Sequence, residues 1–553
     1  MKIPLICLIL TLILFPAPAR AQVTPDLTPG ATQGRYLQNQ QYFQQHQQLK
    51  RQSEQREEAL IEQLGAPDSP AARPAAAARF RLRGVRATPS RILSDDDIDG
   101  VVGRYIGREV TLADLNRMVD AINDLYRQKR ALTARAILPP QEIADGVVQI
   151  ELIEGRLGTL TVTGNRTTRE GFIRGQVRLR EGEPVDLSRL EQDLLRFNAV
   201  YDARIRALLK PGREFGTTDF TLTVVEPNRF EGTIYSDNTG RDETGKERGG
   251  FTVAANSVLG RRDRLSLGGV FADGTQGFNV SYDLPVGRRG TRVRISFDRS
   301  DVDVEDGALA ALNIEGDSEV LAFVVTHPFL VRKACQLSAF TGYNVKSSGT
   351  RVSGVEILTT EVRSAILGVN YLHYDARGYW YAQSVLTQGF DKFGGDREFL
   401  KSNSEFSRIH FLSGRVYVLL RTSLQFSDEP FLPSSEQFQM GGLTTVRGYR
   451  EGILIGDAGY YVNAELHFPI RFTLNNKDFF RNRLNGFLFA DQGGTIAVKD
   501  NDDDNTLVSA GAGFNVRINK YLNGRFVAGF PVKDDLRTDE NDVRFHFYIE
   551  AQF

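Results

Sequence analysis

The C-terminal part of the chain is built from segments in which apolar and polar residues alternate. The final segment shows this most clearly, because one of its faces carries Phe545, Phe547, Ile549, Ala551 and Phe553. Its other face carries His546, Tyr548, Glu550 and Gln552. Alternation with period two places the two sets on opposite sides of a strand. A membrane β-barrel needs this pattern, since lipid covers one face of each strand and the lumen lies behind the other.

The same alternation recurs from Phe230 to Phe553 and predicts about sixteen strands, with ends defined to within about 2–4 residues. Tight connections alternate with long ones, as do the inner turns and outer loops of such barrels. The long connections fall near 302–317, 348–361, 390–403 and 428–458. Residues 428–458 are therefore expected to form the sixth outer loop. The connection near 470–483 is longer than this rule predicts.

A soluble β-sandwich also alternates, but it seldom combines so many strands with a secretory signal and a terminal aromatic residue. We therefore predict a transmembrane β-barrel of about 16 antiparallel strands over residues 229–553. In the segment near 459–468, the lumen-facing residues are expected to be Tyr461, Asn463, Glu465 and His467.

The first 21 residues are expected to be a signal peptide. Lys2 precedes an apolar run from Ile3 to Phe15, and Ala19-Arg20-Ala21 supplies a small-x-small cleavage pattern. Cys335 is then the one cysteine of the mature chain, which excludes an intramolecular disulfide. The formal net charge of -1 gives no support for binding nucleic acid.

Residues 22–64 contain a glutamine-rich stretch, which predicts a helix over 35–64. Its apolar residues are too sparse for a wide buried stripe, so the helix would suit a wet, polar cavity. A glutamine-rich spacer is the alternative. Residues 65–78, with Pro67, Pro70 and Pro74, predict an extended Pro/Ala linker.

Residues 79–158 and 159–228 predict two successive α+β units, each with the order β-α-α-β-β. In the first unit, Ser94 with Asp97 and Thr111 with Asp114 form capping boxes that open two helices. The order of elements resembles that of POTRA domains. Two generic α+β modules are the alternative.

Two motifs strengthen a family resemblance. The long loop contains Val446, Arg447, Gly448 and Tyr449, and a later strand contains Gly486, Phe487, Phe489, Asp491 and Gly493. Together with the barrel ending, these motifs resemble the outer-membrane transporters of two-partner secretion, the haemolysin secretion/activation proteins. In that family the sixth loop folds back into the barrel, and its arginine meets the aspartate of the later strand. The resemblance therefore implies an Arg447–Asp491 ion pair, with a solvated loop arginine as the alternative.

Other motifs fail on inspection. Gly240 to Glu247 has P-loop spacing, but Glu247 replaces the Ser/Thr that would bind magnesium. The acidic run from Asp500 to Asn505 lacks the glycine and terminal glutamate of an EF-hand. The six histidines show no metal-ligand spacing, and no Gly-x-Ser-x-Gly motif is present. We therefore predict no catalytic, cofactor-binding or metal-binding residues, and no enzyme.

The resemblance implies a transporter in the bacterial outer membrane that exports a partner exoprotein of the adhesin or haemolysin type. Its POTRA domains would lie in the periplasm and capture the client, and the helix over 35–64 would occupy the pore at rest. The implied partners are the client, outer-membrane lipid and the barrel-assembly machinery, and the transporter is expected to be a monomer. Phe545, Phe547, Ile549 and Phe553 would form the C-terminal barrel signal.

The main alternative is a barrel-assembly insertase of the same superfamily, which shares the barrel and the arginine loop. A passive porin would leave the two α+β units and Arg447 unexplained. A secreted soluble adhesin conflicts with the ending at Phe553.

Overall fold

The computed structural model describes residues 61–63, 79–129, 131, 133–143, 145–214, 216–307, 309–392, 394–470, 473–474, 477–478, 483–499, 505–533 and 542–553. The predicted signal peptide, the linker over 65–78 and most of the predicted helix over 35–64 lie outside these residues. The chain divides into an α+β unit, Glu57–Pro227 with Leu259–Arg262, and a barrel unit that includes Asn228–Val258 and Asp263–Phe553. None of the helices among the described residues is both long and apolar enough to cross a membrane.

The first half of the α+β unit has the predicted order of elements. Its strands are β2 (Phe80–Arg81), β3 (Gly84–Ala87), β4 (Glu109–Val110), β5 (Ala134–Ile137) and β6 (Val147–Glu154). Its helices are α3 (Asp95–Val102) and α4 (Leu112–Gln128), and both begin with the predicted capping boxes. Hydrogen bonds from Lys129 and from Ser94 lower the pKa of Asp97 to about 2. Helix α4 buries Leu115, Met118 and Ile122 against the three-stranded sheet β3-β6-β5.

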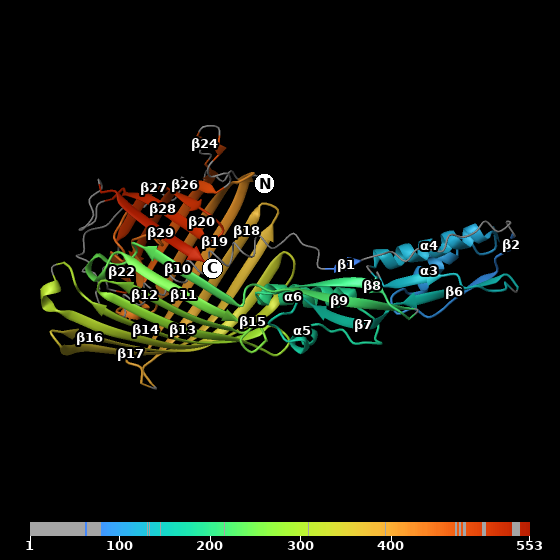
Figure 1. The fold of residues 1–553 in the computed structure, drawn as a ribbon, viewed down its shortest axis with the longest axis horizontal. Coiled ribbons are helices and arrows are strands. Elements are labelled where there is room, and N and C mark those ends of the chain that lie inside the picture. Colours follow the sequence, from blue (N-terminus) through green and yellow to red (C-terminus); the bar gives the residue numbers. More distant parts are fainter. Residues whose placement is uncertain are drawn as a thin grey trace. The chain divides into compact units, whose positions relative to one another are not determined.

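The second half repeats the plan around a separate core. It consists of β7 (Arg156–Thr163), α5 (Glu170–Gln176), α6 (Leu187–Val200), β8 (Arg204–Pro211) and β9 (Thr217–Val225). The sheet order is β1-β8-β9-β7, in which β1 is Ile61–Gln63 (Figure 1). At its end, Glu226 accepts hydrogen bonds from the backbone and hydroxyl groups of Thr167 and Thr168. This carboxylate therefore joins the end of β9 to the start of the helical segment.

Strand β1 (Ile61–Gln63) corrects one expectation. These residues pair in parallel with β8, with Ile61 opposite Ala207 and Gln63 opposite Leu209. The prediction that one helix runs through to Leu64 is therefore wrong at its end. The physical reason is that the open edge of β8 offers main-chain hydrogen bonds, whereas the sparse apolar residues offer a helix little packing.

The barrel unit is a closed antiparallel sheet in the order β10-β11-β12-β13-β14-β15-β16-β17-β18-β19-β20-β23-β26-β27-β28-β29 (Figure 1). Its first eight strands are β10 (Phe230–Asp237), β11 (Arg248–Asn256), β12 (Arg264–Ala272), β13 (Thr275–Val286), β14 (Thr291–Asp303), β15 (Ile314–Val331), β16 (Cys335–Val352) and β17 (Val355–Asp375). The others are β18 (Gly378–Phe390), β19 (Phe399–Ser413), β20 (Val416–Ser427), β23 (Ala458–Pro469), β26 (Leu484–Ile496), β27 (Thr506–Arg517), β28 (Leu522–Pro531) and β29 (Arg544–Gln552). The predicted barrel of sixteen strands is confirmed, and β29 closes it against β10.

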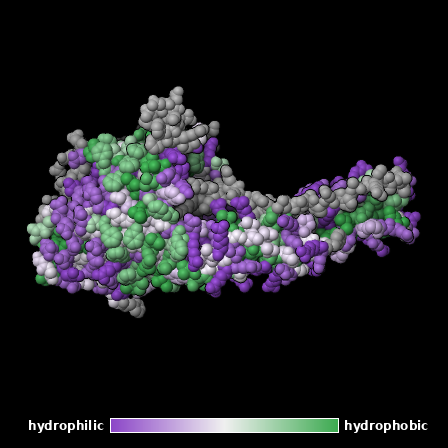
Figure 2. Space-filling view, viewed as in Figure 1, coloured by the Kyte–Doolittle hydropathy of each residue, from purple (hydrophilic) through white to green (hydrophobic). Residues whose placement is uncertain are grey.

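The two sides of the barrel wall differ as alternation requires. The visible outer face carries a broad hydrophobic area with hydrophilic residues beside it (Figure 2). Exposed side chains on these strands include Val253, Leu267, Phe278, Ile295 and Phe323. A continuous apolar surface on the outside of a barrel suits contact with lipid rather than with water.

Short elements occupy several connections of the barrel. The segment with P-loop spacing contains the 3-10 turn η2 (Asp242–Thr244) between β10 and β11, and η3 (Ala310–Leu312) precedes β15. Strand β11 follows η2, so this segment is a connection between two barrel strands. The long connection near 470–483 contains two short paired strands, β24 (Thr473–Leu474) and β25 (Lys477–Asp478).

The inward loop and its contacts with the barrel wall

The segment 428–458, here called the inward loop, consists of a stalk and a tip. The 3-10 turn η4 (Ser434–Glu436) leads into β21 (Phe438–Met440), which pairs antiparallel with β22 (Leu454–Gly456) to form the stalk. Residues 441–453 form the tip between these two strands. Met440, Val446 and Tyr449 of the loop are fully buried. A loop bathed in solvent would not bury such side chains, so the tip lies packed against the wall.

Arg447 and Asp491 meet in a buried, two-point ion pair. The Nε of Arg447 donates to Oδ2 of Asp491 at 2.7 Å, and its Nη2 donates to Oδ1 at 2.7 Å. The backbone N–H of Arg447 donates to the same carboxylate at 3.1 Å. The side chains are 2% and 0% exposed. The fork of a guanidinium matches a carboxylate in this way, which an ammonium cannot reproduce.

A second carboxylate completes the cluster. Glu465 on β23 accepts a hydrogen bond from Nη1 of Arg447 and another from Nη2 of Arg525 on β28, the latter at 2.8 Å. His467 Nε2 lies 2.6 Å from the other oxygen of Glu465. Arg447, Glu465, Asp491 and Arg525 are here called the tip cluster. It holds two guanidinium groups and two carboxylates, so its formal charge is balanced apart from any proton on His467.

Sequence reasoning assigned Glu465 and His467 to the lumen but did not connect them with Arg447. The period-two pattern of β23 shows which face they share. It does not show which part of the loop reaches that face. Arg525 was missed entirely, although it also lies on an alternating strand.

Two phenylalanine rings form the floor beneath the guanidinium groups. The Cζ of Arg447 lies 3.7 Å from the ring centre of Phe489, and that of Arg525 lies 4.5 Å from the ring centre of Phe487. A cation over an aromatic face gains electrostatic attraction, the more so where water is excluded. The rings themselves cover Gly511 and Gly513 on β27, where any side chain would collide with them. Phe487, Phe489 and Asp491 therefore share the inner face, as their spacing predicts.

The tip approaches the wall at glycines. A side-chain carbon on Gly529 of β28 would lie 2.8 Å from the Cα of Gly448, closer than such atoms approach. Gly448 also has a φ of +92°, which favours glycine. A side-chain carbon on Gly493 would lie 2.9 Å from Val446. Beside it, the Tyr449 hydroxyl donates to the carbonyl oxygens of Val508 and Lys533 at 2.9 and 2.6 Å.

The remaining predicted residues do not all belong to this cluster. Gly486 lies where a side chain would meet Ile470 and Phe468 instead of the loop. Phe545 and Phe553 are 69% and 61% exposed, and they lie with Phe547 and Ile549 on the opposite face of β29 from the buried His546 and Glu550. The C-terminal set is therefore separate from the arginine cluster. The acidic run predicted from Asp500 lies largely outside the described residues.

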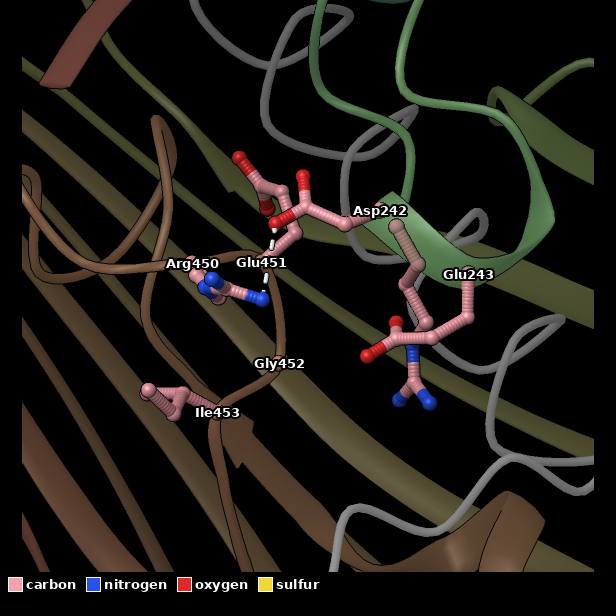
Figure 3. Close-up of a pocket in the computed structure, with 7 residues that line it drawn as sticks. Asp242, Glu243, Arg450, Glu451, Gly452 and Ile453 are labelled. Carbon is pink, nitrogen blue, oxygen red and sulfur yellow. Dashed lines mark ion pairs between the residues drawn. The ribbon is translucent and has the colours of Figure 1, made fainter. Parts of the chain in front are cut away.

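The far side of the tip contacts the connection between β10 and β11. Arg450 lies 3.3 Å from Asp242 (Figure 3). Asp242 also pairs with Arg544 on β29 at 2.7 Å. Arg241 donates to Gln439 of the stalk at 3.2 Å. These contacts join the inward loop to the first and last strands of the barrel. Among the described residues, no group of His, Cys, Asp or Glu side chains is placed to hold a metal ion.

A closed antiparallel barrel with an apolar outer face and an ion-paired loop folded inside it defines an outer-membrane β-barrel transporter rather than an open porin. The α+β modules that precede the barrel fit this class of transporter, because they resemble periplasmic POTRA domains.

Comparison with known proteins identifies the family. Residues 216–516 match the model for the haemolysin secretion/activation protein ShlB/FhaC/HecB, and residues 80–155 match the ShlB-type POTRA domain. The first match covers more than half of the chain, and the chain belongs to this family of outer-membrane transporters of two-partner secretion. The barrel accordingly lies in the outer membrane, with the POTRA region in the periplasm.

Individual relatives agree with this assignment. The outer membrane transporter CdiB of Dickeya dadantii is 25% identical over 488 residues, which cover 82% of this chain and 83% of that protein. The heme/hemopexin transporter protein HuxB of Haemophilus influenzae is 23% identical over 389 residues, covering 67% and 68%. The structure of CdiB from Escherichia coli shares the fold with a TM-score of 0.70 at 21% identity, covering 96% of this chain and all of that one.

Proposed function

We propose that this protein exports one dedicated partner exoprotein, of the adhesin or haemolysin type, from the periplasm to the cell surface by two-partner (type V) secretion. The observation that carries the proposal is the inward loop, whose tip is held to the inner wall by the buried Arg447–Asp491 pair. A loop fixed in this way narrows the lumen at rest. It can also leave, because the charges that hold its tip can be hydrated once water reaches them.

The α+β unit supports capture of the client in an extended form. The edge of β8 already pairs with an extended segment of this chain, β1. The sheet β3-β6-β5 ends in the strands β3 and β5, which have one strand partner each among the described residues. An extended client can add to such an edge through main-chain hydrogen bonds, without a rigid fit between side chains. We infer that residues 79–158 and 159–228 act as two POTRA domains that receive the client.

Other parts of the proposal concern the rest of the chain. We assign the helix predicted within residues 35–64 to the pore at rest. Residues Ile61–Gln63, at the end of this range, form a strand that pairs with β8. Outward-facing Phe545, Phe547, Ile549 and Phe553 suit recognition by the barrel-assembly machinery during biogenesis. The proposal takes the transporter to act as a monomer. It assigns no catalytic step, cofactor, metal or nucleic acid to this chain.

The test is export of the large exoprotein encoded beside this protein, measured in the medium with and without Arg447→Ala. The proposal expects export that depends on the transporter and falls with the substitution, while the barrel still reaches the outer membrane. If export of the exoprotein is unchanged by depletion but other barrels fail to assemble, this protein is an insertase and the proposal is wrong.

A further inference from the structure

The inward loop contacts the wall at a second buried ionic site, on other strands than the tip cluster. Glu436, at the base of the stalk, lies 2.6 Å from the Nζ of Lys346 on β16 and 2.7 Å from the Nζ of Lys401 on β19. These three residues are here called the base cluster. The side chain of Glu436 is 3% exposed, and those of Lys346 and Lys401 are 17% and 9% exposed. Neither the family motifs nor the alternation of residues pointed to this site.

Glu436 of the loop is held to the wall by charges and by hydrogen bonds. Burial acts to raise the pKa of Glu436, but the two lysine charges outweigh burial and lower this pKa to about 2. Lys401 also donates to the backbone carbonyl of Glu436 at 2.7 Å, and Gln425 of β20 donates to the same oxygen at 3.0 Å. A buried carboxylate between two cations is costly to separate, since each removed partner strands a charge.

The two legs of the loop are also tied together at the base of the stalk. The carboxylate of Asp457 accepts hydrogen bonds from the backbone N–H groups of Phe431 and Leu432, at 2.6 and 2.8 Å, across the two legs of the loop. Gln425 donates to the carbonyl of Asp457 at 2.9 Å. Together with the β21–β22 pairing, these bonds make the stalk a short two-stranded ribbon fixed at its base.

The two clusters contact different strands. The tip cluster involves β23, β26 and β28, whereas the base cluster involves β16 and β19, with β20 beside it. Release of Arg447 would therefore leave every base contact in place. Near the two ends of the tip segment 441–453, where it joins the stalk, Gly441 and Gly452 have positive φ angles.

We propose that Lys346, Lys401 and Glu436 position the gate: they hold the stalk to the wall as a pivot, while export displaces only the tip. This inference rests on the proposed function in one respect, that the barrel is a gated pore. Loss of the base cluster would free the stalk from the wall and leave the loop held by the tip cluster alone.

The first test is ion conductance of the purified full-length protein in planar bilayers, with no client present. Glu436→Gln keeps the shape of the side chain but leaves two buried lysines without their carboxylate. We expect the fraction of time spent in open states to rise at least about tenfold. Glu361→Gln is the matched control, because Glu361 on β17 pairs with Arg363 at 2.8 Å on the wall itself. Equal conductance of Glu436→Gln and the control would overturn the proposal.

A second test separates the pivot from release of the whole loop, and it does not depend on how well Glu436→Gln folds. In a Cys335→Ser background, Gly456→Cys with Thr495→Cys would close a disulfide between stalk and wall, because a Cβ on Gly456 would lie 3.1 Å from that of Thr495. The pivot predicts that the oxidised stalk bridge leaves export within about twofold of the reduced protein.

Block of export by the stalk bridge would show that the stalk must move, and would overturn the pivot. Failure of export in the parent and in the reduced stalk variant would instead count against the proposed function. The conductance result with Glu436→Gln would still decide the role of the base cluster.

Discussion

The substitution Asp491→Asn isolates the charge that holds the tip. The carboxylate of Asp491 accepts the Nε and Nη2 groups of Arg447 and the side-chain amide of Asn463, all at 2.9 Å or less. Asparagine keeps one acceptor oxygen, but it turns an N–H group toward the guanidinium. Arg447 would then depend on Glu465, which Arg525 already shares.

The expected magnitude follows from burial. Removal of one partner from a buried ion pair costs roughly 3–5 kcal/mol. Because Glu465 still faces Arg447, the lower end applies, and about 3 kcal/mol corresponds to an increase on the order of 100-fold in the undocked fraction of the loop. The barrel itself should be little affected, since its wall is held by the hydrogen bonds between strands.

The assay is the rate of labelling of a cysteine at Thr444 by a membrane-impermeant maleimide, in a Cys335→Ser background. Thr444 is 2% exposed in the docked loop, so labelling requires release of the tip. Asp283→Asn is the control, because Asp283 pairs with Arg294 at 3.2 Å on the barrel wall. If the Asp491→Asn protein is labelled as slowly as this control, the ion pair does not hold the loop and the reasoning is refuted.

Three further outcomes are expected. The charge swap Arg447→Asp with Asp491→Arg should restore export only weakly, because the new carboxylate faces Glu465. Adding Glu465→Gln should raise the amount of exoprotein found in the medium. Gly529→Ala should undock the tip and speed the maleimide reaction several-fold, because the new methyl group meets the loop backbone. Burial acts to raise the pKa of Glu226, but hydrogen bonds outweigh burial and lower this pKa. The stabilising contribution of Glu226 is therefore present above its pKa in the unfolded chain and is lost as pH falls through its pKa in the folded chain. Glu226→Gln should make the thermal unfolding temperature of the α+β unit less dependent on pH in the acid range.

Alternation predicted the barrel because it records where each side chain points. A strand that carries Phe487, Phe489 and Asp491 at every second position can place them only on one face. Capping boxes similarly marked the starts of α3 and α4, because the capping residues act on their own backbone. These signals are local, so one sequence is enough to read them.

The contacts between the loop and the wall are not local, and alternation could not find them. Glu436 is 90 residues from Lys346 and 35 from Lys401, counting from their positions in the chain. Nothing in the spacing of these residues indicates that they meet. The Arg447–Asp491 contact was expected because of a family resemblance, and Glu465, which completes it, has no motif of its own. The strand at Ile61–Gln63 was missed for the same reason, since it depends on the edge of β8.

The chemistry of the tip cluster suits a gate better than apolar packing would. In a dry site the attraction between Arg447 and Asp491 is strong, and separating them strands both charges. In water, two unit charges about 4 Å apart attract by only ~1 kcal/mol, and each recovers its hydration when released. The apolar contacts of the loop, such as that of Val446, are not eased by water in this way. An extended client that brings water to the tip therefore weakens the contact it must displace. The base cluster, on β16 and β19, keeps the stalk in place for reclosure.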